Sequence, residues 1–208
     1  MSLDTRTLRM LIETLSAYSA IMRPPKPRLG TLQVREKDLA MTIAVAAIEE
    51  ASRQLGSEAC EEFAKEIGAD PSACRYPWLR DVFSQNVLAV YLTTRVADEA
   101  IAVALDGFEV TESNLEKAVR IGAEAVKKVG VWRLLAYTAA RILSPDARAL
   151  IKGYLNELGR RAREKRRGVL KGKVRRADIA LAIDAVLKMA LMSVMRRFTL
   201  DSRSPATA

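Results

Sequence analysis

Apolar residues recur every three or four positions along most of this chain, and no stretch alternates apolar and polar residues with a period of two. The first spacing is typical of amphipathic helices, and the second of half-buried strands. We therefore predict an all-α fold of about eight helices. The expected helices cover residues 5–22, 36–55, 58–67, 78–105, 111–129, 131–143, 145 onwards and 177–198.

Proline and glycine mark several of the expected helix ends. Gly56 is predicted to end the second helix, because glycine favours the conformations found at helix C-termini. Three prolines within Arg23–Gly30 end the first helix, because proline cannot donate a backbone hydrogen bond. This proline-rich segment is either a hinge or an ordinary loop. The predicted organisation is an N-terminal helix–Pro-rich turn–helix arm followed by a helical bundle, with arm and basic connector at 1–35, bundle at 36–198 and a polar tail at 199–208.

The last predicted helix is the most apolar. Between Ile179 and Met195, apolar residues cover most of its circumference, which predicts a helix buried on all sides. It is either the central helix of the bundle or a helix with one face against another subunit. Met189, Met192 and Met195 would suit an adaptable interface of the second kind. Charged residues interrupt this segment, so we expect no membrane span anywhere in the chain.

Positive charge is concentrated in one short segment. The whole chain carries a formal net charge of +9, and the segment Arg160–Arg176 alone carries ten basic residues against one acidic residue, Glu164. The rest of the chain is balanced, so the segment creates a local field that favours a polyanionic partner. Nucleic acid is the first candidate and an anionic membrane surface the second; the alternative is a solvated run without a partner. The candidate nucleic-acid-binding residues are Arg160, Arg161, Arg163, Lys165, Arg166, Arg167, Lys171, Lys173, Arg175 and Arg176.

The residue types in this segment predict contact with phosphates rather than with bases. It contains no Asn or Gln, which are the usual readers of adenine, and no aromatic residue on which single-stranded bases could stack. Arginine, in contrast, presents a planar fork that suits phosphate. We therefore expect binding to duplex DNA that is independent of base sequence. If most of the ten residues contact phosphates, the logarithm of the binding constant should fall with a slope of about −6 to −9 against the logarithm of salt concentration.

Catalytic chemistry is weakly indicated. The chain has no histidine, which excludes Ser-His, Cys-His and His-metal arrangements. We expect no enzyme activity, no catalytic residue, no cofactor and no metal site. Cys60 and Cys74 are too few for a structural zinc site, and we expect two buried free thiols, with a single disulfide bond as the alternative.

The N-terminal helix, the Pro-rich basic turn and the Ala-rich second helix, spanning Leu3–Leu55, resemble the major coat (nucleocapsid) proteins of filamentous archaeal viruses of hyperthermophiles, of the tristromavirus, rudivirus and lipothrixvirus type. The resemblance implies an arm that wraps double-stranded DNA, possibly in A-form, and a bundle that packs outward. It also implies a homo-oligomer, or a hetero-oligomer with a related coat protein, and a place in the virion. The arm residues that would contact the genome are Arg6, Arg9, Arg23, Lys26 and Arg28.

Three other functions stay open at this point. A helical subunit of an RNA-guided defence complex, or a nucleoid-type DNA binder, would also need a basic surface without base readout. A protein of anionic membrane surfaces would use the same charge on lipid headgroups. An enzyme with an unrecognised carboxylate site is the third. Outside a virion, we expect a cytoplasmic protein.

Overall fold

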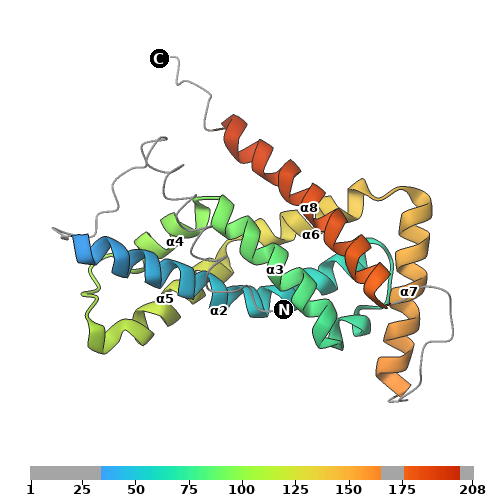
Figure 1. The fold of residues 1–208 in the computed structure, drawn as a ribbon, viewed down its shortest axis with the longest axis horizontal. Helices are drawn as coiled ribbons and strands as arrows, with labels where there is room; N and C mark the ends of the chain where they lie inside the picture. The colour runs from blue at the N-terminus through green and yellow to red at the C-terminus, as the bar shows by residue number, and fades with distance from the viewer. Residues whose placement is uncertain (1–33, 165–175, 202–208) are drawn as a thin grey trace.

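The computed structural model describes residues 34–164 and 176–201, and within these ranges the protein is built from helices without any β-strand. The all-α prediction is therefore confirmed as a helical bundle (Figure 1). The predicted N-terminal helix and the proline-rich connector lie outside the described residues, and so do residues 202–208 of the predicted polar tail. Residues 199–201 of that tail instead continue the last helix, which was predicted to end at 198. The elements are α2 (Val34–Glu66), the 3-10 helix η1 (Pro71–Arg75), α3 (Pro77–Thr93), α4 (Val96–Ala104), the 3-10 helix η2 (Glu112–Asn114), α5 (Leu115–Lys128), α6 (Val131–Ile142), α7 (Pro145–Glu164) and α8 (Arg176–Asp201).

Helix α2 is the axis around which the bundle is arranged. It contacts α3, α5 and α6 along its length, and α7 stands across one end of the molecule (Figure 1). Ala47, Ala51 and Leu55 of α2 are almost fully buried. The small side chains of the two alanines let neighbours approach closely: a Cβ added to Gly122 of α5 would lie 2.9 Å from the Cβ of Ala47. The predicted alanine-rich helix is thus a central helix.

The predicted break at Gly56 is wrong, because α2 continues through this glycine to Glu66. Gly56 is buried against α3, and a Cβ there would lie 2.6 Å from the Cα of Ser84. Glycine inside a helix costs about 1 kcal/mol relative to alanine, and here it permits two backbones to approach. The break comes later, at Gly68, whose φ of 70° is the left-handed conformation that favours glycine.

The predicted rod from 78 to 105 is divided into two helices. Helix α3 ends at Thr93, and Thr94 has an extended backbone with φ −107° and ψ 133°. The Thr93 hydroxyl donates to the carbonyl oxygen of Ala89 at 2.7 Å, and the Thr94 hydroxyl to that of Val90 at 2.8 Å. Side-chain donors of this kind compete for the carbonyls at a helix end, and they allow the chain to turn into α4.

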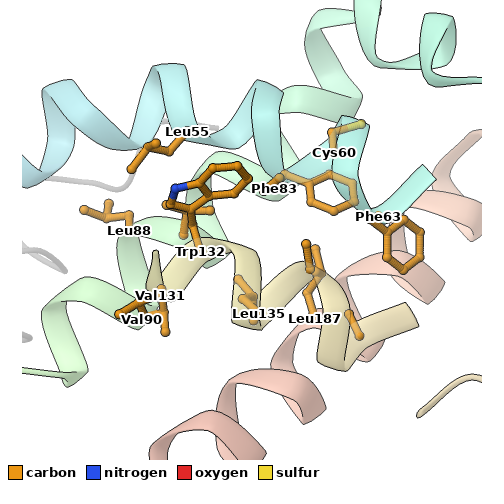
Figure 2. Packing of buried hydrophobic residues seen from close by; sticks show 14 of the residues in the cluster. Leu55, Cys60, Phe63, Phe83, Leu88, Val90, Val131, Trp132, Leu135 and Leu187 are labelled. Carbon is orange, nitrogen blue, oxygen red and sulfur yellow. The ribbon is translucent and has the colours of Figure 1, made fainter. Parts of the chain in front are cut away.

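The core contains a disulfide bond between Cys60 of α2 and Cys74 of η1, so the expectation of two free thiols is wrong and the alternative holds. Both residues are about 1–2% exposed. Phe63 and Phe83 pack beside them with ring centroids 5.4 Å apart, and Trp132 and Leu135 of α6 fill the same core (Figure 2). The turn at Gly68 brings the two sulfur atoms together, which the spacing in sequence does not reveal.

The prediction that the last helix is the central helix of the bundle is wrong, whereas the alternative, one face against another subunit, stays a prediction. Helix α8 packs one face against α3 and α6, where Ile183, Leu187 and Ala190 are fully buried. Its opposite face is open to solvent. Within the described residues, no helix is both long enough and apolar enough to cross a membrane.

Candidate nucleic-acid interface

The predicted basic segment joins the end of α7 to the start of α8, and the structure describes its two ends. Arg160, Arg161 and Arg163 lie in the last turns of α7, and Arg176 is the first residue of α8. The remaining candidate residues lie outside the described ranges; these are Lys165, Arg166, Arg167, Lys171, Lys173 and Arg175 in the segment, and Arg6, Arg9, Arg23, Lys26 and Arg28 in the arm.

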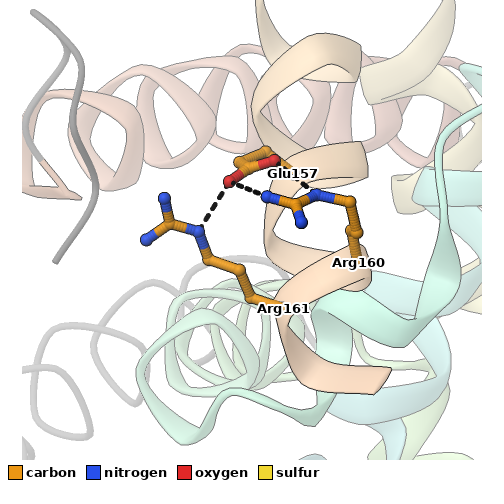
Figure 3. A network of polar contacts seen from close by, with 3 residues as sticks. All are labelled: Glu157, Arg160 and Arg161. Carbon is orange, nitrogen blue, oxygen red and sulfur yellow. Dashed lines mark hydrogen bonds and ion pairs between the residues drawn. The ribbon is translucent and has the colours of Figure 1, made fainter. Parts of the chain in front are cut away.

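Glu157 holds the first two arginines on the surface of α7 (Figure 3). Arg160 donates to both carboxylate oxygens, at 3.0 Å from Nε and 2.8 Å from Nη2, and the Nε of Arg161 donates at 2.6 Å. These hydrogen bonds, from Arg160 and then from Arg161, lower the pKa of Glu157 to about 2. One carboxylate therefore compensates part of the charge of two arginines.

The spacing of this network is visible in the sequence, although we did not predict the network from it. Glu157 precedes Arg160 by three residues and Arg161 by four, and helical residues three and four apart face each other. Arg161 is only 16% exposed at its side chain, against 50% for Arg160. Of these two guanidinium groups, that of Arg160 is the more accessible to an external anion.

Arg163 forms a second ion pair, with Asp70, which lies 93 residues earlier in the chain. The Asp70 carboxylate also accepts from the backbone N–H of Ser72 at 2.9 Å and so caps η1. Burial acts to raise the pKa of Asp70, but the Ser72 hydrogen bonds and the charge of Arg163 outweigh it and lower the pKa. The backbone N–H of Asp70 donates to Oδ1 of Asn156 at 2.8 Å. The end of α7 is thereby fastened to η1.

Arg176 fastens the other end of the segment. Its guanidinium carbon lies 4.7 Å from the ring centroid of Trp78 at the start of α3, a cation–π contact. The hydroxyl of Tyr154 is buried and has no hydrogen-bond partner among the described residues. Burial raises the pKa of this hydroxyl, and the charges of Arg176 and Arg161 partly oppose that shift. The Tyr154 hydroxyl is therefore subject to the charges at both ends of the basic segment.

These contacts divide the predicted site into two parts. Arg160, Arg161 and Arg163 are engaged with carboxylates of the protein itself. The stretch 165–175 between the two fastened ends contains six basic residues and no acidic residue, by sequence alone. By sequence, most of the positive charge of the predicted site therefore lies in this stretch, outside the described residues.

Aromatic residues were missing from the basic segment, but the fold brings them to its ends. Trp78 and Tyr76 follow η1, and Tyr154 comes from α7. No signal in the sequence links them to residues 160–176, because they meet only through the packing of α7 on η1 and of α8 on α3. Among the residues that the structure describes, no cluster of three or more Cys, Asp or Glu side chains could hold a metal ion.

The fold and this site define the structural class of the protein. It is an all-α helical bundle in which the residues at both ends of a basic segment are fixed by contacts with the bundle. No protein-family model, curated protein or solved structure matches the chain.

Proposed function

We propose that this protein binds duplex DNA through sequence-independent contacts of its basic segment with phosphates, and that it assembles with further copies to coat the DNA as a viral nucleocapsid protein does. The observation that carries the proposal is the stretch 165–175, with six basic residues and no acidic residue, held between the ends of two well-packed helices. Fixing both ends reduces the conformational entropy that the stretch would lose on binding.

The ion pairs of α7 change the expected number of phosphate contacts. Arg160, Arg161 and Arg163 already have carboxylate partners, so the main contacts come from the six residues of the stretch 165–175 and from Arg176. About 0.9 counterions are released for each phosphate neutralised on duplex DNA. We therefore expect a salt slope of about −5 to −6, smaller than the slope expected for ten contacts.

The test is fluorescence anisotropy of the full chain with two 30-base-pair duplexes of unrelated sequence, over a range of salt concentrations. Both duplexes should give the same affinity and the same slope. Replacing the six basic residues of 165–175 by glutamine should abolish most of the slope. A control variant removes the same charge from exposed positions elsewhere: Arg53, Lys65, Lys117, Arg120, Lys128 and Lys152 to glutamine.

The control should retain the wild-type slope, because its changes are scattered over other surfaces. If both variants lose the same part of the salt slope, net charge alone drives binding. A wild-type slope near zero would reject the proposal. Double-stranded RNA and anionic phospholipid vesicles are used as competitors. Preferential displacement by either would reject DNA as the partner and support the RNA-guided complex or the membrane surface instead.

The coating part of the proposal has its own test. Negative-stain imaging of the full chain with linear duplex DNA should show regular filaments that do not form with the six-residue variant. Discrete particles under all conditions would contradict a coat protein while leaving DNA binding itself intact.

A further inference from the structure

The outer face of α8 is an apolar surface without a partner among the described residues. Leu181, Met189 and Met192 are 67%, 52% and 59% exposed. Ala185 is exposed on the same face, since these four positions follow the spacing of helix turns. The C-terminal turns of α8 project beyond the neighbouring helices (Figure 1). Exposed apolar side chains gathered on one face indicate a contact surface rather than scattered surface residues.

Charges of opposite sign lie at the two ends of this face. Asp178 is exposed in the first turn of α8, and Arg196 is exposed near its end. They are 18 residues apart, which is five helical turns of 3.6 residues and roughly 27 Å along the axis. Both therefore point to the same side of the helix as the apolar residues. Lys188, at the edge of the face, is bound by Asp184 of the same helix at 2.6 Å.

This arrangement is complementary to itself when two copies run in opposite directions. A two-fold axis midway between Asp178 and Arg196 places Asp178 of each copy opposite Arg196 of the other copy. The dimer would therefore contain two such pairs of opposite charge. The same axis places small Ala185 opposite Met189 of the second copy, and Leu181 near Met192. A parallel arrangement would instead oppose like charges at both ends, which is unfavourable.

We propose that the outer face of α8 binds the same face of a second copy of this chain, as an antiparallel two-fold pair of helices. The occupant is a second copy because the surface is complementary to itself in both charge and side-chain size. The inference deepens the self-assembly part of the proposed function and is independent of its DNA-binding part. The pair would be the unit from which a larger assembly grows.

The experiment measures dimerisation by sedimentation equilibrium of the full chain, without nucleic acid. The variants Asp178→Arg and Arg196→Asp each place two like-charged pairs in the dimer, and each should weaken it by at least about tenfold. The double variant Asp178→Arg/Arg196→Asp restores opposite charges in exchanged positions and should recover dimerisation. A parallel pair or an unrelated interface would show no such recovery.

The apolar part of the face has a separate variant. Met192→Glu should give a monomer with an unchanged midpoint of thermal unfolding, because Met192 is exposed in the subunit. Val103→Glu is the matched control, because Val103 is a 78% exposed apolar residue on α4, away from α8. It should leave the dimer intact.

A monomeric wild-type chain at the highest concentrations would overturn the proposal, and so would a dimer that all three α8 variants leave unchanged. In the first case, the chain's own N-terminal residues are the next candidate to cover the face. A dimer that forms through α8 but does not bind DNA would uphold this inference and reject the proposed function. DNA binding by a chain that stays monomeric would reject this inference and uphold the DNA-binding part of the proposed function.

Discussion

Gly159 of α7 lies directly against the carboxylate of Asp70, and a Cβ at position 159 would overlap the side-chain atoms of that aspartate. Asp70 is the residue that caps η1 and pairs with Arg163. The absence of a side chain at 159 therefore allows α7 to approach the loop that holds the disulfide bond. The position of the C-terminal end of α7, where the basic segment begins, depends on this contact.

We expect Gly159→Ala to lower the free energy of unfolding by about 1–3 kcal/mol, because the added methyl group must displace Asp70 from its hydrogen bonds. Gly153→Ala on the same helix is the control. A Cβ at position 153 meets nothing within 4 Å, so this variant should gain about 0.5–1 kcal/mol from helix propensity. Urea denaturation of both variants checks the prediction. Equal changes in the free energy of unfolding for the two variants would contradict it.

Gly56→Ala should be more damaging than Gly159→Ala. The added Cβ meets the Cα of Ser84 at 2.6 Å, and a backbone atom cannot rotate away as a side chain can. We expect a loss of about 3 kcal/mol or more. The double variant Gly56→Ala/Ser84→Ala removes the Ser84 hydroxyl and should recover only part of the loss. Full recovery would show that the hydroxyl, and not the backbone, limits the approach of α3.

The bond between Cys60 and Cys74 closes a loop with a sequence separation of 14. A loop of about this length is expected to contribute about 3 kcal/mol by restricting the unfolded chain. Cys60→Ala/Cys74→Ala should lower the free energy of unfolding by about this amount. Wild-type protein in reductant should lose as much, whereas reductant should not affect the variant. A wild-type protein indifferent to reductant under unfolding conditions would contradict the prediction.

Removing the carboxylate of Glu157 should strengthen DNA binding. Glu157→Gln releases Arg160 and Arg161 from their ion pairs, and each can then add a phosphate contact. The salt slope should become steeper by about 1–2. Glu116→Gln on α5 removes the same charge from an exposed pair with Arg120 and serves as the control. Anisotropy titrations should show the steeper slope only for Glu157→Gln.

The lowered pKa values of Glu157 and Asp70 predict how stability changes in acid. A carboxyl group whose pKa is lower in the folded protein stabilises it above the unfolded value, near 4.5 for Glu157, and that contribution is lost as pH falls toward 2. The midpoint temperature of thermal unfolding should therefore decrease as the pH is lowered from 4.5 to 2. Glu157→Gln should show a smaller fall across that interval. An identical fall in both proteins would mean that other groups control the acid transition.

The helical class, the approximate positions of most helices and the concentration of positive charge could all be predicted from the amino-acid sequence. These depend on properties that act locally, namely the 3.6-residue period of apolar side chains and the charge of neighbouring residues. The start of α7 at Pro145 and the ion pairs of Glu157 belong to the same group, because they involve residues a few positions apart.

Features that depend on which helix lies against which could not be predicted, because they arise from contacts between residues far apart in the sequence. The sequence predicts a helix end at Gly56, but Gly56 lies inside α2, where the absence of a side chain allows the close approach of Ser84. The sulfur atoms of Cys60 and Cys74 meet because the chain turns at Gly68, and Asp70 meets Arg163 across 93 residues. An apolar circumference does not say how many neighbours a helix has, so only packing could show that α8 is covered on one side and open on the other.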